Sequence, residues 1–102
     1  MDQQQNGGWS VVESATPEVQ NICNKVKTQV EAFIPEVAFD HFTAVSFAHQ
    51  TGKRMNFVIK VDVETSVSVH VMVSAALPGY PEDLKVLRIQ YPKSSSDPLQ
   101  PF

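Results

Sequence analysis

Apolar and polar residues alternate almost without interruption over two stretches in the second half of the chain. The first stretch covers residues 55–63, the second covers residues 67–73, and the polar residues 64–66 between them have the composition of a turn. An alternation with a period of two places the apolar side chains of a strand on one face. The pattern therefore predicts two neighbouring β-strands, each with one face in the core.

A further strand is expected before this pair, joined to it through a hairpin. Residues 37–47 are rich in valine and phenylalanine, but the phase of their pattern is ambiguous, so a bulge near residues 40–42 is expected. The polar segment 49–54 separates this strand from Met55 and contains Gly52, which is free to adopt a positive φ. A hairpin with an exposed polar tip follows.

The last strand is expected near the end of the chain. Residues 75–81 contain the pair Pro78-Gly79, which is typical of a tight turn, and apolar residues then recur from Leu84 to Tyr91. Residues 92–102 contain three serines and three prolines and show no strand pattern. They are predicted to form an extended tail.

A helical period precedes the strands. The segment Thr16-Pro17-Glu18 offers an N-cap, a proline at the first helical position and an acid at the positive helix end. Apolar residues then recur at spacings of three and four as far as Phe33, and Pro35 should end the helix at about Ile34. Cys23 lies within this apolar stripe, so we expect a small buried residue rather than a nucleophile.

The N-terminal residues are polar or glycine. No apolar residue lies between Met1 and Trp9, so residues 1–8 cannot bury enough surface to offset their ordering and are expected to be flexible. Trp9, Val11 and Val12 form a short apolar step that would dock as an edge strand or beside the helix. Trp9, the single tryptophan, would either pack on the domain or contact a partner.

These elements combine into one domain over residues 1–102 with an α+β fold. A chain of 102 residues of which 42% are hydrophobic suits a single core. The helix and the strands each have an apolar face, and consecutive strands with short links pair with their neighbours. We therefore expect one long helix packed on a wrapped antiparallel β-sheet of four to five strands.

Charge and composition argue against several classes of partner. The net charge is -3, with 8 basic and 11 acidic residues, which does not favour nucleic acid or an anionic membrane. The N-terminus lacks the basic start and apolar run of a secretory signal, and no run of eighteen apolar residues occurs. One cysteine allows no internal disulfide. A cytoplasmic protein is expected.

The residues that carry chemistry form no recognisable catalytic set. His41, His49 and His70 lack metal-ligand spacing, and the acidic residues are scattered singly along the chain. Gly7-Gly8 precedes no strand-to-helix turn, so no phosphate cradle is expected. We therefore expect a binding module that is not an enzyme and that needs no metal or cofactor.

Short segments spread over nearly the whole chain form an ordered series. They are Gly7-Gly8, Ala15-Thr16-Pro17-Glu18, residues 27–31, Ala44-Val45-Ser46-Phe47, Asn56-Phe57-Val58-Ile59-Lys60-Val61, Val69-His70, Leu77-Pro78-Gly79, Glu82-Asp83-Leu84 and the terminal Phe102. In this series the chain resembles the stefins, the type 1 members of the cystatin family of cysteine-protease inhibitors. The lack of a signal and of disulfides also suits stefins rather than secreted cystatins.

The resemblance implies a cystatin-like fold and a reversible competitive inhibitor of papain-like cysteine proteases, the cathepsins among them. Three parts would enter the active-site cleft as a wedge. They are the N-terminal segment with Gly7 and Gly8, the first hairpin with Gln50, Thr51, Gly52, Lys53 and Arg54, and the second loop with Leu77, Pro78 and Gly79.

The sequence departs from the family pattern at two of these parts. The family's first hairpin usually reads Gln-Val-Val-Ala-Gly, whereas here Lys53 and Arg54 place long cations where the family has small residues. The polar residues Gln5 and Asn6 also leave the N-terminal segment without an apolar anchor. Weaker inhibition, or a preference for clefts with acidic residues, would follow.

Two alternatives to protease inhibition stay open. In one, a stefin-fold protein with weakened inhibition uses the altered hairpin Gly52-Lys53-Arg54 to bind a different partner. In the other, the protein is structural or self-associating, because exchange of the helix and first strand across the hairpin would convert the expected monomer into a domain-swapped dimer.

Overall fold

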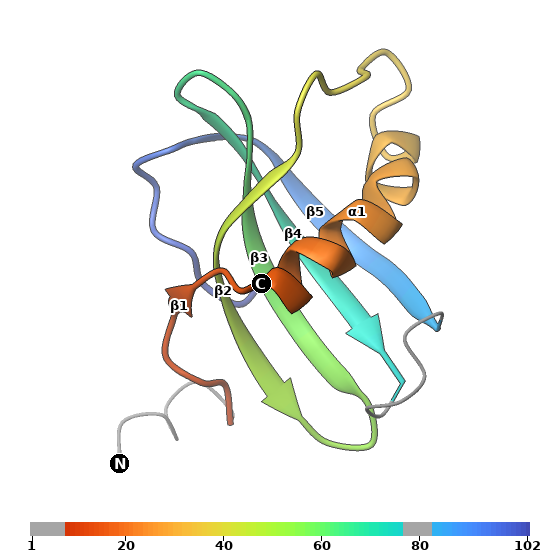
Figure 1. Cartoon of the computed structure of the whole chain (residues 1–102), viewed down its shortest axis with the longest axis vertical. Coiled ribbons are helices and arrows are strands. Elements are labelled where there is room, and N and C mark those ends of the chain that lie inside the picture. The colour runs from red at the N-terminus through yellow and green to blue at the C-terminus, as the bar shows by residue number, and fades with distance from the viewer. Residues whose placement is uncertain (1–7, 77–82) are drawn as a thin grey trace.

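The helix and the strands are arranged in two layers. The computed structural model describes residues 8–76 and 83–102. In these residues the order is β1 (Glu13–Ser14), α1 (Pro17–Ala32), β2 (Thr43–Thr51), β3 (Met55–Glu64), β4 (Val67–Ala75) and β5 (Leu84–Ser94). The strands form one antiparallel sheet in chain order, and α1 crosses one face of it (Figure 1). The expected α+β fold is confirmed, with five strands.

Helix α1 begins as its sequence predicts and ends slightly earlier. The Thr16 side chain accepts a hydrogen bond from the Val19 amide at 3.2 Å, and Pro17 occupies the first helical turn. The helix was expected to reach Ile34, but Phe33 is already the C-cap. The Phe33 amide donates to the carbonyl three residues back, which tightens the last turn and leaves this side chain 48% exposed. No helix within the described residues is long and apolar enough to span a bilayer.

The start of β2 differs from the prediction. The strand begins at Thr43 rather than near residue 37, and its irregularity lies between Ala44 and Ser46 rather than near residues 40–42. The Gln20 side chain explains the late start, because it donates to the Phe42 carbonyl at 3.0 Å and accepts from the Ala44 amide at 2.8 Å. A helix side chain thus takes the place of a strand partner at this point.

The main core lies between α1 and the sheet. It takes the alternating apolar residues of β3 and β4, as the sequence predicts, together with the apolar stripe of the helix. Its buried members are Val19, Cys23, Val26, Val30, Phe39, Phe42, Phe47, Ile59, Val61, Val63, Val69, Val71, Val73 and Val86. The buried position expected for Cys23 is confirmed.

A second, smaller core lies on the opposite face of the sheet. It consists of Trp9, Ala48, Val58, Met72 and Leu99, with Phe102 partly buried beside them. Strand β4 is therefore buried on both faces, although only its valine face was expected to be. Of the two roles considered for Trp9, packing on the domain is the one observed.

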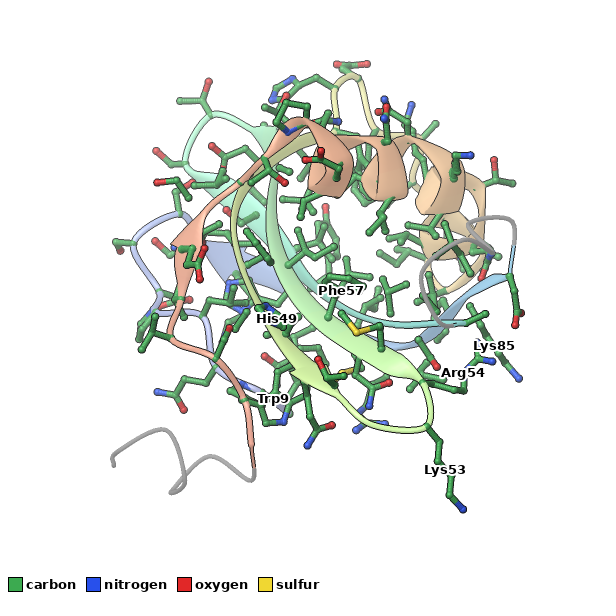
Figure 2. All side chains as sticks on the ribbon, turned by 60° about the horizontal axis from the view of Figure 1, so that its bottom comes forward. Trp9, His49, Lys53, Arg54, Phe57 and Lys85 are labelled. Carbon is green, nitrogen blue, oxygen red and sulfur yellow. The ribbon has the colours of Figure 1, made fainter. Side chains whose placement is uncertain are left out.

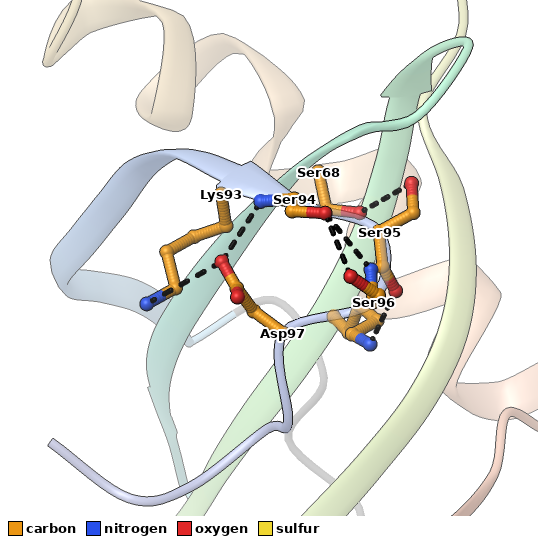
Figure 3. A network of polar contacts seen from close by, with 7 residues as sticks. Ser68, Lys93, Ser94, Ser95, Ser96 and Asp97 are labelled. Carbon is orange, nitrogen blue, oxygen red and sulfur yellow. Dashed lines mark hydrogen bonds and ion pairs between the residues drawn. The ribbon is translucent and has the colours of Figure 1, made fainter.

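The C-terminal residues are attached to this second face. Strand β5 continues to Ser94, past Pro92, so the prediction that the strand pattern stops before Pro92 is wrong. Proline is tolerated there because β5 is an edge strand. Beyond it, the Ser95 carbonyl accepts from Lys60 Nζ at 2.9 Å, and the Asp97 carboxylate accepts from the Ser94 amide at 2.9 Å (Figure 3).

Candidate functional site

The β2–β3 hairpin is regular up to its last residues. Thr51 pairs with Met55 and Gln50 pairs with Asn56 across the two strands. The Asn56 side chain also donates to Gln50 Oε1 at 3.0 Å. The Gly52 amide donates to the Arg54 carbonyl at 3.1 Å and closes a loop of three residues, 52–54. The hairpin part of the expected wedge is thus a short loop at the end of a well-paired two-stranded ribbon.

Gly52 does not use the conformation for which a glycine was expected. None of the loop residues 52–54 has φ in the left-handed region. A Cβ added at Gly52 would meet the Arg54 carbonyl oxygen at 3.8 Å, which is ordinary van der Waals contact. The expectation of a positive φ at Gly52 is therefore wrong.

The two cations of the loop point in different directions. Lys53 is exposed and points away from the body of the molecule, whereas Arg54 stays against the sheet (Figure 2). Arg54 Nε donates to Ser74 Oγ at 2.6 Å, and Nη1 donates to Asp83 Oδ2 at 3.0 Å. The sequence predicted that both long cations would face a partner. In the structure, of these two side chains only Lys53 points outward (Figure 2).

The hairpin loop and the base of the second loop lie at the same end of the sheet, where β2 and β4 end and β3 and β5 begin. Met55 is paired with Ala75, and Ala75 is paired with Leu84, so the three residues form one row across β3, β4 and β5. The Ala76 amide donates to the Asp83 carbonyl at 3.2 Å and closes the base of the segment 77–82. Leu77, Pro78 and Gly79 lie within that segment and outside the described residues.

The N-terminal segment is attached beside the end of β2. The Ser10 amide donates to the His49 carbonyl at 2.8 Å, and Ser10 Oγ accepts from the His49 amide at 3.0 Å. Gly8 precedes this attachment with a φ of 87°, a left-handed conformation that favours glycine. Gly7 lies outside the described residues.

Sequence comparison shows the family to which the chain belongs. The chain is 36% identical over 96 residues to cystatin-A8 from Sus scrofa, which covers 94% of this chain and 92% of that protein. The cystatin-A proteins of Felis catus and Homo sapiens are 35% and 36% identical, over 94% of this chain and 97% of each relative. The chain belongs to the cystatin family and is of the stefin type. No family model matches this stefin.

Membership of this family also decides the general class of activity. A relative from Sus scrofa that is 35% identical, over 94% of this chain and 92% of its own length, is named leukocyte cysteine proteinase inhibitor 1. The cystatins are a family of cysteine-proteinase inhibitors rather than enzymes. The expectation that this stefin is not an enzyme is confirmed on that ground.

The histidines and the cysteine of the stefin do not gather into one place. Within residues 8–76 and 83–102, no group of three or more His, Cys, Asp or Glu side chains could hold a metal ion. Burial raises the pKa of the Cys23 thiol to about 12, so this thiol stays protonated and is a poor nucleophile.

His70 is the exception among the histidines because it is buried. Its side chain is 1% exposed, on the face of the sheet that residues 94–99 cross, and its Nε2 atom has no hydrogen-bond partner. Burial lowers the pKa of His70 to about 4, and the positive charges of Lys93 and Lys60 act in the same direction. Sequence reasoning did not predict this burial, because His70 alternates with the valines of β4 and was expected on the polar face of the strand.

Sequence reasoning also missed the partners of the loop. Ser74 and Asp83 lie 20 and 29 residues away from Arg54 along the chain. No local motif connects them, and only the register of β3, β4 and β5 brings them together.

Proposed function

We propose that this stefin is a reversible competitive inhibitor of papain-like cysteine proteases, the cathepsins among them. Three parts would occlude the active-site cleft: the N-terminal segment with Gly7 and Gly8, the hairpin loop of residues 50–54, and the segment with Leu77, Pro78 and Gly79. The row of paired residues Met55, Ala75 and Leu84 supports the proposal, since it puts the bases of the hairpin loop and of the second loop at the same end of one sheet.

The physical advantage of this arrangement is additive contact. Each part would contribute a small backbone or apolar contact, and parts carried by one rigid sheet bind together without a separate loss of translational and rotational freedom for each. The attachment of Ser10 to His49 supports the role of the N-terminal segment, because it fixes Ser10 beside the end of β2.

The proposal is tested by titrating an endopeptidase and an exopeptidase of the papain class with the full chain. We expect the apparent KM to rise with inhibitor concentration while kcat stays constant, and activity to return on dilution. The inhibitor should remain uncleaved after prolonged incubation. No inhibition of either enzyme at roughly 1 μM would contradict the proposal.

A second candidate is a stefin with weakened inhibition whose altered hairpin binds a different partner. The observation that favours it is the outward position of Lys53 at the tip of the loop (Figure 2). The variant Lys53→Ala separates the candidates. Inhibition that is stronger by orders of magnitude in the variant would mean that the natural loop is not adapted to these proteases, whereas unchanged or weaker inhibition would contradict the second candidate.

A further inference from the structure

The guanidinium group of Arg54 lies between the hairpin loop and the base of the second loop. Three of its N–H groups have acceptors. Nε donates to Ser74 Oγ at 2.6 Å, Nη1 donates to Asp83 Oδ2 at 3.0 Å, and Nη2 donates to the Asp83 carbonyl at 3.4 Å. That carbonyl also accepts from the Ala76 amide, which closes the base of the segment 77–82. One side chain therefore joins a loop residue, strand β4 and the residue that precedes β5.

The contacts of Arg54 differ in their protection from water. The side chains of Arg54 and Asp83 are 41% and 57% exposed, so water and salt screen the ion pair between them. Ser74 is buried, and its bond to the charged Nε is short. The planar fork of the guanidinium reaches both partners at once, which the single ammonium of a lysine cannot do.

We propose that Arg54 is a positioning residue that holds the hairpin loop of residues 50–54 in register with the base of the second loop. This inference rests on the proposed function, because the register matters when two loops must enter one cleft together. Without the link, the loops would sample arrangements of which only some fit the cleft. Affinity then falls in proportion to the fraction of molecules that are ready to bind.

The orientation of Arg54 argues against a direct contact with the protease. Its N–H donors are directed at Ser74 and Asp83, whereas the neighbouring Lys53 is directed outward (Figure 2). Arg54 is a long cation at the position where the family usually has glycine. It therefore affects how the two loops are held together and does not add a charge that points outward.

The experiment measures the inhibition constant and the association rate constant for papain with four variants of the full chain. They are Arg54→Ala, Asp83→Ala, the double variant, and Lys25→Ala, which removes one positive charge from the exposed face of α1. We expect Arg54→Ala to weaken inhibition about tenfold, mainly through slower association. Asp83→Ala should weaken it less, because the bonds of Arg54 to Ser74 and to the Asp83 carbonyl remain and the lost ion pair is exposed. The double variant should be no weaker than Arg54→Ala, and Lys25→Ala should match the natural chain.

Two results of the inhibition assay would overturn the proposal. If Arg54→Ala inhibits as well as the natural chain, the link has no effect on binding. If the losses of Arg54→Ala and Asp83→Ala add fully in the double variant, the two side chains act independently and Arg54 acts by direct contact with the protease.

A second measurement does not depend on inhibition. Hydrogen exchange at the Ala76 amide reports on the base of the second loop, because this amide donates to the Asp83 carbonyl. We expect about tenfold faster exchange at Ala76 in Arg54→Ala, with no change at Val71 in the middle of β4. Unchanged exchange at Ala76 would overturn the inference. If the natural chain fails to inhibit papain, the proposed function fails, and this measurement still decides whether Arg54 holds the two loops together.

Discussion

Acidification should destabilise the protein through His70. The pKa of this side chain is about 4 in the folded protein and about 6.5 in an unfolded chain. Between these values the unfolded chain binds the proton and the folded protein does not. The stabilisation is therefore complete above pH 6.5 and is lost as the pH falls toward 4. At about 1.4 kcal/mol per pH unit, the loss reaches at most about 3 kcal/mol.

The surroundings of His70 explain the direction of this effect. The imidazole is buried on β4, Lys60 on β3 and Lys93 on β5 disfavour its protonation, and Asp97 favours it only weakly by comparison. Nε2 has no hydrogen-bond partner that would accept from it when it is protonated. Protonation would thus place an uncompensated charge between two lysines.

The assay is urea unfolding at steps between pH 7 and pH 4, followed through the fluorescence of Trp9, which is the single tryptophan and is buried. Carboxylates also titrate in this range, so the variant His70→Met serves as the control, with a side chain of similar volume and no titrating group. We expect the natural chain to lose about 3 kcal/mol more than the variant between pH 7 and pH 4. Parallel curves for the two proteins would refute the reasoning.

Four further predictions concern the framework of the site. Thr16→Ala should cost about 1 kcal/mol through loss of the helix N-cap, as measured by urea unfolding, and Thr16→Ser should retain most of the stability. Trp9→Ala should cost about 3 kcal/mol by circular dichroism, because it empties the centre of the second core, and a loss below about 1 kcal/mol would contradict that role. Gly52→Ala should change stability by less than about 0.5 kcal/mol, since a Cβ has room there. Gly8→Ala should speed amide exchange at Ser10, because a left-handed backbone costs other residues about 1 kcal/mol.

The elements with a strong local signal could be predicted from the sequence. Thr16 and Pro17 mark the start of α1 because capping and the fixed φ of proline act within one turn. The alternation in β3 and β4 identifies their shared core face because the valines of one parity, at positions 61, 63, 69, 71 and 73, pack in the main core against the helix layer. These signals need no knowledge of the distant chain.

The second core could not be predicted, because its members are isolated in the sequence. Trp9 follows a polar segment, and Leu99 lies between prolines and glutamine, so neither belongs to a periodic pattern. They are core residues because Met72 of β4 points to the second face of the sheet, where residues near both ends of the chain pack together. The same limit applies to Arg54, whose partners are brought near by strand register alone.

The second core has a consequence for the handling of this protein. Trp9 and Leu99 share one cluster, and Arg88 Nε donates to the main-chain oxygen of Phe102 at 2.7 Å. The two chain termini are therefore energetically coupled across the back of the sheet. Removal of the residues from Leu99 onward would loosen Trp9 and the Gly8 segment that it anchors. Protein preparations that differ only at one end should differ in behaviour at the other.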